Sequence, residues 1–250
     1  MLPDFCRPTL LPEQPGTPGP HVTPRGVRTA APSMVGCVAQ NTNQRATNDR
    51  IVWVDCEMTG LSLTTDALIE VAALVTDFEL NQLGEGIDLV ISPPAEALEQ
   101  MDDFVRNMHT SSGLLDELAA GIPMAQAEEQ VLAYVREWVP EAAKAPLAGN
   151  SVGTDRGFLA RDMPELESHL HYRIIDVSSI KELSRRWFPR AYFSSPKKAG
   201  GHRALADIRE SIAELRYYRE AVFVAPPGPD SETAKAIAAR YEIGPPTTTT

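Results

Sequence analysis

Residues 51–57 read Ile51-Val52-Trp53-Val54-Asp55-Cys56-Glu57, a short apolar run that ends in two acids. A run of this length, rich in β-branched and aromatic residues, predicts a buried β-strand. Alternate residues of a strand point to the same face, so we expect Asp55 and Glu57 to project together while Cys56 turns toward the core. Two carboxylates held this close cost free energy unless a cation lies between them. Acids are also common at solvated strand ends, so this pair alone does not decide the function.

The hydrophobic pattern changes along the chain beyond this strand. Two more apolar runs, 68–76 and 85–91, predict an antiparallel meander of three strands. Helical spacing then covers 96–118 and 124–139. The rest alternates, with strands at 146–149 and 172–176, helices that begin near Thr154 and Ser178, and a last long helix at 203–221. This order predicts an α/β domain with a mixed five-stranded sheet flanked by helices.

Composition divides the chain into three parts. Residues 1–48 hold 8 of the 21 prolines and almost no hydrophobic periodicity, which predicts a disordered, Pro-rich extension. A translation start at Met34 is the alternative, with the upstream residues an artefact of gene assignment. Residues 49–224 carry the alternating pattern and form the predicted folded domain. Residues 225–250 begin with a Pro- and Gly-rich break and predict a loosely ordered tail that contains a short helix at 232–241.

Charge and composition exclude several classes of protein. The 250 residues are 43% hydrophobic and 23% charged, as in a globular protein. A net charge of −11 argues against a protein that coats DNA by charge alone. Three cysteines without paired spacing suit neither a disulfide framework nor a zinc site, and they indicate a reducing compartment. No run reaches the roughly 18 apolar residues of a membrane span, so we expect no membrane association and a cytoplasmic location.

A third acid, Asp155, follows the strand that ends near Asn150. It falls in the first turn of a predicted helix, where a carboxylate is stabilised by the helix dipole. The turn also lies at the carboxyl end of a strand, where α/β sheets place their ligands. Asp155 therefore has a structural interpretation and a functional one, in which it joins the pair on the first strand.

His202 and Asp207 lie on either side of the start of the last long helix. If both were helical, five residues would separate their side chains by about 140°, too far for one small site. Gly200 and Gly201 allow His202 to lie on a loop beside Asp207 instead. A loop histidine is commonly a solvated surface group, but beside an acid-rich site it is also suited to act as a general base.

Together these stretches supply four carboxylates and one histidine: Asp55, Glu57, Asp155, Asp207 and His202. Oxygen ligands of this kind select hard cations such as Mg²⁺ or Mn²⁺. Two such ions can hold the attacking and leaving oxygens of a phosphoryl displacement, with a histidine to take the proton of the attacking water. The set predicts metal-dependent hydrolysis of a phosphodiester.

The order Asp-x-Glu, Asp and His-x-x-x-x-Asp resembles the DEDDh group of 3′-to-5′ exonucleases, which have a ribonuclease H-like fold. Within that group the oligoribonuclease family is much more similar, over about residues 50–222. The similarity rests on matched stretches in the same order: Trp53-Val54-Asp55-Cys56-Glu57-Met58-Thr59-Gly60-Leu61, Met101-Asp102-Asp103-Phe104, 150–155, His171-Tyr172-Arg173, Asp176-Val177-Ser178, 181–187, Asp207-Ile208-Arg209-Glu210-Ser211 and Glu214-Leu215.

The resemblance implies a substrate class and residue roles. It implies a homodimer that degrades short RNA, especially 5′-phosphorylated dinucleotides, to mononucleotides, and that also cleaves linear dinucleotides. It assigns metal binding to Asp55, Glu57, Asp155 and Asp207, and the general base to His202. It also implies that Leu61 wedges between the two bases and that Phe104 stacks on the 3′ base. The implied cap over the 5′ phosphate consists of Ser151, Arg173, Ser178 and Tyr172 of the partner subunit.

Some positions depart from the family pattern. Phe104 stands where many relatives have Trp, which keeps an aromatic face for stacking. Gly201 replaces a common Thr before the histidine, and Ala206 replaces an acid before Asp207. Two alternatives stay open: another DEDDh exonuclease that acts on longer RNA or DNA ends, and a protein that binds short RNA without cleaving it.

The remaining tryptophans and histidines have structural interpretations. The apolar pattern around Trp53, Trp138 and Trp187 predicts core positions for all three. The other histidines of the patterned region, His109, His169 and His171, have no second ligand type at metal spacing, and we expect structural or interfacial roles for them.

Overall fold

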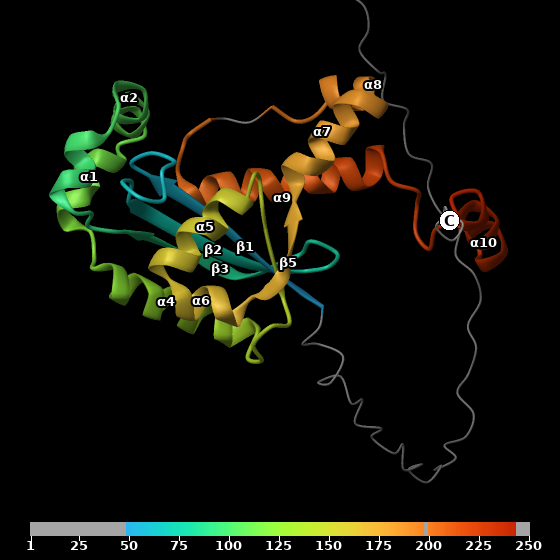
Figure 1. Ribbon diagram of the computed structural model, residues 1–250, viewed down its shortest axis with the longest axis horizontal. Helices are drawn as coiled ribbons and strands as arrows, with labels where there is room; N and C mark the ends of the chain where they lie inside the picture. Colours follow the sequence, from blue (N-terminus) through green and yellow to red (C-terminus); the bar gives the residue numbers. More distant parts are fainter. Residues whose placement is uncertain (1–48, 198–199, 244–250) are drawn as a thin grey trace, which may run out of the picture. The chain divides into compact units, whose positions relative to one another are not determined.

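The computed structural model describes residues 49–197 and 200–243, which all lie within one unit of the chain, Asn41–Thr250. A five-stranded sheet with the order β3-β2-β1-β4-β5 forms its centre (Figure 1). The antiparallel meander consists of β1 (Arg50–Met58), β2 (Leu68–Asp77) and β3 (Gln82–Val90). The shorter strands β4 (Pro146–Gly149) and β5 (His171–Asp176) run parallel to β1. The predicted mixed α/β sheet is confirmed.

Helices connect and cover these strands. Between β3 and β4 lie α1 (Ala95–Gln100), α2 (Asp103–Ser111), α3 (Leu114–Glu117), a 3₁₀ turn η1 (Leu118–Ala120) and α4 (Met124–Trp138). Between β4 and β5 lie α5 (Gly153–Asp162) and α6 (Pro164–His169). After β5 follow α7 (Val177–Trp187), α8 (Pro189–Phe193), α9 (Ala204–Ala221) and α10 (Ser231–Ala239).

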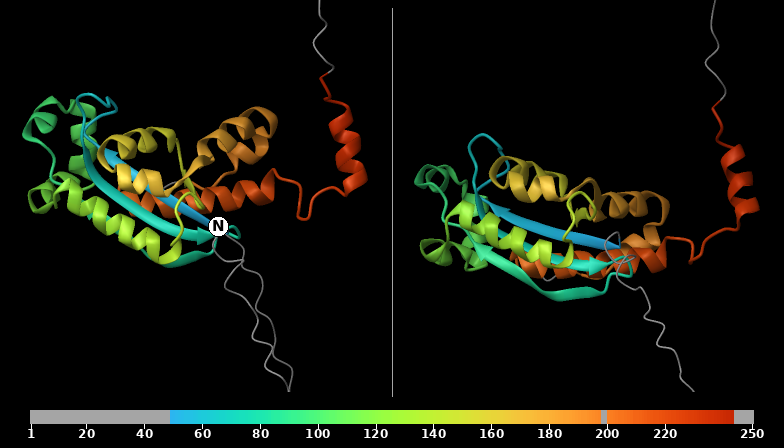
Figure 2. Two further views of the ribbon diagram at one scale, coloured as in Figure 1. Left: turned by 60° about the horizontal axis from the view of Figure 1, so that its bottom comes forward. Right: turned by 90° about the horizontal axis from the view of Figure 1, so that it is seen from below.

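The alternation of β1 directs its residues into two separate cores. Val52, Val54 and Cys56 pack with residues of α4, α5 and α6, whereas Ile51 and Trp53 pack with residues of α7 and α9. α4 and α9 accordingly cover opposite faces of the sheet, as Figures 1 and 2 show from three directions. Because the odd-numbered residues share one face, the strand delivers Asp55 and Glu57 to the face that α9 covers.

The helical region after the meander differs from the expectation. The predicted helix over 96–118 is divided into α1, α2 and α3. Met101 interrupts it with extended backbone (φ −58°, ψ 123°), and Gly113 does so in the left-handed region (φ 80°). The short helices α6 and α8 were not predicted, and each has proline at its start, where the fixed φ of that residue suits a first helical turn.

The expectation that all three tryptophans are core residues was wrong for Trp187. Trp53 is fully buried and donates from Nε1 to Thr76 Oγ1 at 2.9 Å. Trp138 is half-buried, but the side chain of Trp187 at the end of α7 is 66% exposed. An apolar position on an amphipathic helix can face a core or the surface, and periodicity does not distinguish them.

Some sequence-based expectations lie outside the described residues. The segment 1–48, with the alternative start at Met34, is among them, and the boundaries at 48/49 and 224/225 stay predictions. The helix expected at 232–241 is present as α10. No helix in the described part of the chain has both the length and the apolar character that crossing a bilayer requires.

Candidate active site

β1 supplies two acids on the α9 face of the sheet. Glu57 is buried, and Asp55, two residues earlier, is half-buried. Cys56 between them is buried in the opposite core, as expected, and burial raises the pKa of its thiol well above the ordinary value. The thiol therefore stays protonated and packs as a small apolar group.

Asp155 is held against β1 by a hydrogen bond to the backbone. It lies in the first turn of α5, after a tight turn in which Ser151 has a φ of 54°. Its Oδ1 accepts from the backbone N–H of Cys56 at 3.0 Å, so the carboxylate lies beside the peptide that separates Asp55 from Glu57. Burial raises the pKa of Asp155 to about 6. The functional interpretation of this acid, in which it joins the β1 pair, agrees with this position.

His202 lies on the loop before α9, and Asp207 lies in the first turn of that helix. One potential ligand atom each from Glu57, His202 and Asp207 lie within 4.8 Å of one another. The structure thus brings together three of the five residues that the sequence predicted for this site. Asp55 and Asp155 are not members of this group of three, but both adjoin it through β1.

Glu57, His202 and Asp207 lie in a cluster of acids whose negative charges repel one another. Burial, followed by the negative charges of Glu70, Asp207 and Asp155, raises the pKa of Glu57 to about 8, although Arg203 acts in the opposite direction. A cation placed among these carboxylates would favour their ionised forms. The donor set is mostly carboxylate oxygen, the type that hard divalent cations prefer. The residues therefore fit a divalent metal site.

The two apolar side chains that the resemblance assigns to base contacts are both exposed. Leu61, on the loop between β1 and β2, is 75% exposed, and Phe104 at the start of α2 is 78% exposed. Phe104 and His202, with Met108 and the Gly200-Gly201 loop, line a cavity of about 450 Å³. An aromatic face beside the candidate base is the arrangement that a stacked nucleobase requires.

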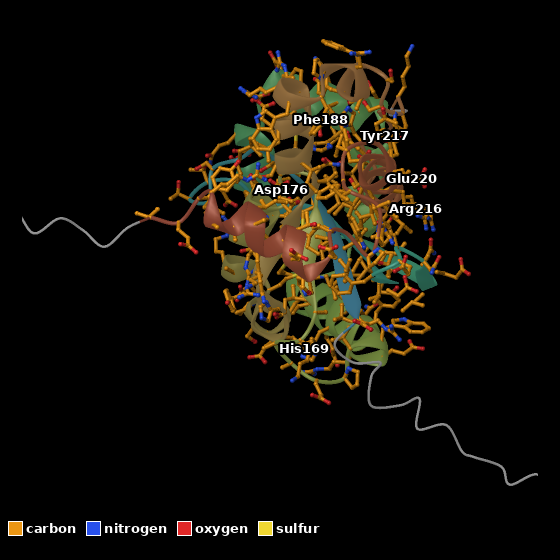
Figure 3. All side chains as sticks on the ribbon, turned by 90° about the vertical axis from the view of Figure 1, so that its right-hand side faces the viewer. His169, Asp176, Phe188, Arg216, Tyr217 and Glu220 are labelled. Carbon is orange, nitrogen blue, oxygen red and sulfur yellow. The ribbon has the colours of Figure 1, made fainter. Side chains whose placement is uncertain are left out.

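The residues expected to cap a 5′ phosphate form two pairs. The Oγ atoms of Ser151 and Ser178 are 3.1 Å apart, and Asp176 Oδ1 accepts from both of their backbone N–H groups at 2.9 and 3.0 Å. Figure 3 labels Asp176 at this end of β5. On the same strand, Arg173 Nε donates to Tyr172 Oη at 3.1 Å, and both side chains are exposed. Within the described residues no hydrogen bond joins the serine pair to the Tyr172–Arg173 pair.

Sequence reasoning missed a buried acid next to the site. Glu70 is fully buried on β2, directly opposite Glu57 in the antiparallel register. It contacts Arg203, which also pairs with Glu117. A single charge within the apolar run 68–76 was the signal that could have found it, because a lone buried acid requires a partner.

The histidines for which we expected structural or interfacial roles each make contacts within the fold, and one of them, His109, borders the site. His109 is fully buried with Nε2 2.9 Å from the carbonyl oxygen of Met58, and its Nδ1 is 3.9 Å from Glu57 Oε2. His169 is buried, with Nε2 2.8 Å from the carbonyl oxygen of Val139. His171 Nδ1 accepts from the backbone N–H of Arg173 at 3.1 Å.

Comparison with known proteins agrees with this fold. The family model described as Exonuclease matches residues 52–215, so the class of protein is that of the exonucleases. The structure of Escherichia coli exonuclease I with single-stranded DNA and zinc has a TM-score of 0.55 at 17% identity, and that of exonuclease I from Methylocaldum szegediense has 0.50 at 22%. The matches cover 69% and 70% of this chain but 41% of each of those longer chains, and they show the fold alone.

Curated relatives narrow the class to a family. Oligoribonuclease of Streptomyces avermitilis is 76% identical over 196 residues, which cover 78% of this chain and 98% of that protein. Oligoribonuclease of Cutibacterium acnes is 64% identical over 192 residues, covering 77% and 95%. The chain belongs to the oligoribonuclease family.

Proposed function

We propose that this protein is a metal-dependent 3′-to-5′ exoribonuclease that degrades short oligoribonucleotides to nucleoside monophosphates. In this proposal the preferred substrates are linear dinucleotides that carry a 5′ phosphate. The observation that carries it is the convergence of Glu57, His202 and Asp207 within 4.8 Å, beside a buried Asp155 and an exposed aromatic face at Phe104. Its relatives in Streptomyces avermitilis and Cutibacterium acnes are oligoribonucleases, which supports the same substrate class.

Asp55, Glu57, Asp155 and Asp207 are the proposed ligands of two divalent cations, Mg²⁺ or Mn²⁺. Such cations supply positive charge that acidifies a coordinated water and neutralises the departing 3′ oxygen. His202 takes the proton of the attacking water at a ring nitrogen, and its exposed position on the loop lets it release that proton to solvent. Leu61 separates the two bases, and Phe104 stacks on the 3′ base.

The preference for short RNA follows from a closed 5′ end. Ser151, Ser178 and Arg173 provide hydroxyl and guanidinium donors of the kind that hold a phosphate. In the proposed dimer, Tyr172 of the partner subunit completes this cap. A longer strand has no exit past such a cap, and a short substrate needs few phosphate contacts. The net charge of −11 is then no obstacle to binding.

A homodimer is supported by the exposed side of β5. This strand lies at one edge of the sheet, and an open edge is a template for pairing with another chain. Tyr172 and Ile174 on β5 are exposed, as are Trp187 and Phe193 on α7 and α8. Exposed aromatic side chains in such numbers mark an interaction surface. We propose the cytoplasm as the location, because the cysteine usage fits a reducing compartment.

The test is a ladder of 5′-phosphorylated RNAs of increasing length, incubated with the protein and Mg²⁺ or Mn²⁺. We expect turnover to be fastest on the dinucleotide, to fall with length, and to stop when EDTA is added. A flat length profile would indicate another DEDDh exonuclease that acts on longer ends. Tight dinucleotide binding with no mononucleotide release in either metal would indicate a binding protein without catalysis.

A further inference from the structure

Among the described residues on the N-terminal side of His202, the two glycines directly before it do little to hold it. Gly200 (φ 69°) and Gly201 are exposed, and a Cβ atom added to either would meet no other atom within 4 Å. His202 itself has a φ of 46°, in the left-handed region that costs free energy for a residue with a side chain. Another contact must therefore hold the backbone of His202 in this conformation and keep its imidazole in place.

The residue that follows His202, Arg203, is held by hydrogen bonds to two carboxylates. Arg203 Nε donates to Glu70 Oε1 at 2.8 Å, and its Nη1 and Nη2 donate to the two carboxylate oxygens of Glu117 at 2.8 and 3.0 Å. The second oxygen of Glu70 accepts from the backbone N–H of Ala204 at 3.1 Å. Glu70 therefore binds the first residue of α9 as well as the residue before it.

The contacts of Arg203 and Glu70 also connect the elements that carry the candidate ligands. Glu70 lies opposite Glu57 in the β1–β2 register, and paired residues of antiparallel strands share a face. On the helix side, the carbonyl oxygen of Arg203 accepts from the backbone N–H of Asp207 at 3.0 Å. One hydrogen-bonded path thus connects the strand of Glu57, the loop of His202 and the helix of Asp207.

We propose that Arg203 is a positioning residue for His202, held by Glu70 and Glu117 so that the imidazole keeps its place beside Glu57 and Asp207. The inference rests on the proposed role of His202 as the general base. The planar guanidinium is required because it binds two carboxylates at once through separate N–H groups, whereas a lysine ammonium is a point charge without this fork. Glu70, fully buried, in turn requires this cation.

A double-mutant cycle tests the proposal. Turnover of a 5′-phosphorylated dinucleotide with Mn²⁺ is measured for the wild type, Arg203→Gln, His202→Ala and the double variant. We expect Arg203→Gln to lower kcat about 10-fold or more with KM nearly unchanged, as for other residues that orient a catalytic group. In the His202→Ala background the same change should have almost no effect, because the group that it positions is gone. Arg203→Lys should restore only part of kcat.

Two further variants control for folding. Arg219→Gln removes another α9 arginine that pairs with a glutamate, Glu79, and should leave kcat unchanged. Glu117→Gln leaves the contact between Arg203 and the buried Glu70 in place and changes a half-exposed side chain, so it should fold even if Arg203→Gln does not. It should lower kcat several-fold, again only when His202 is present.

The outcomes separate this inference from the proposed function. If Arg203→Gln and Glu117→Gln lower kcat equally in both backgrounds, or leave it unchanged, Arg203 does not act through His202 and the inference is wrong. If His202→Ala itself keeps wild-type kcat, His202 is not the base and the inference fails, whereas the proposed function fails only if the wild type does not release mononucleotides from the dinucleotide.

Discussion

Glu57 shows at the scale of one residue why this site is suited to a cation. It faces Glu70 across the β-ladder, and its burial, followed by the charges of Glu70, Asp207 and Asp155, raises its pKa to about 8. A fold keeps such a cluster only when something offsets the repulsion among its members. Arg203 offsets part of it on one side, and a divalent cation would do so on the other.

The raised pKa values of Glu57 and Asp155 make the stability of the fold depend on pH. The pKa of Glu57 is about 8 in the folded chain against an ordinary 4.5, and that of Asp155 is about 6 against 3.8. Between each pair of values the folded state binds more protons than the unfolded state, so the free energy of unfolding falls as pH rises. We expect the Tm of metal-free protein to fall between about pH 5 and pH 8, measured by differential scanning calorimetry.

Two further measurements identify the groups that cause the fall in Tm with pH. Mn²⁺ should raise Tm more at the upper end of the pH range than at the lower, because it binds the ionised carboxylates. Glu57→Gln should flatten the fall in Tm. A metal-free Tm that rises through this range, or a Glu57→Gln variant with the same slope as wild type, would contradict the assignment.

Asp155 provides a prediction that separates chemistry from folding. Asp155→Asn keeps an oxygen to accept from the N–H of Cys56 but removes the negative charge. We expect dinucleotide hydrolysis to fall by more than about 10²-fold, the upper range for residues that only support a ligand, while far-UV circular dichroism stays unchanged. Asp162→Asn, at the other end of α5, is the matched control and should keep wild-type turnover. Wild-type turnover in Asp155→Asn would remove this residue from the site.

At the scale of elements, β5 and the adjacent α7 and α8 leave several large apolar side chains exposed. Tyr217 of α9 donates to the carbonyl oxygen of Ala191 in α8 at 2.6 Å, which ties this region to the central helix. Figure 3 labels Phe188, between α7 and α8, and Tyr217 of α9. The outer side of β5 has exposed Tyr172 and Ile174 instead of a covering element.

Complementation between subunits tests whether Tyr172 acts across this edge. Tyr172→Ala and Asp155→Asn should each be nearly inactive as homodimers. If Tyr172 serves the neighbouring site, mixing the two variants should restore activity, because one site of the mixed dimer then has both an intact Asp155 and an intact Tyr172. Absence of recovery after confirmed subunit exchange, measured on a 5′-phosphorylated dinucleotide, would mean that Tyr172 acts within its own chain or not at all.

The elements were predictable where one local pattern decided them. The apolar run of β1 and the helical spacing of α4 and α9 each favour one structure, and all three are present as expected. The division of 96–118 depends on the backbone of Met101 and Gly113, and the exposure of Trp187 depends on tertiary packing. Neither is encoded in hydrophobic periodicity.

At the scale of the whole molecule, the site exists because three distant stretches meet at the carboxyl end of β1, the central strand of the sheet. Sequence motifs identified Asp55, Glu57, Asp155, His202 and Asp207 as candidates, and the fold brings Glu57, His202 and Asp207 together. Glu70 could not be predicted in the same way. Its role depends on the register of β2 against β1 and on a contact with Arg203, which is 133 residues away. Pairings of that kind are fixed only by the completed fold.

The most direct test of the account is a Mn²⁺ titration in which bound metal, followed by electron paramagnetic resonance, and mononucleotide release from a 5′-phosphorylated dinucleotide are recorded together. For the wild type we predict about two Mn²⁺ ions per chain, as a two-metal site requires, with release rising as they bind. Asp207→Asn should bind less Mn²⁺ and release almost no product. Undiminished Mn²⁺ binding by Asp207→Asn, or product release by wild type in excess EDTA, would contradict the account.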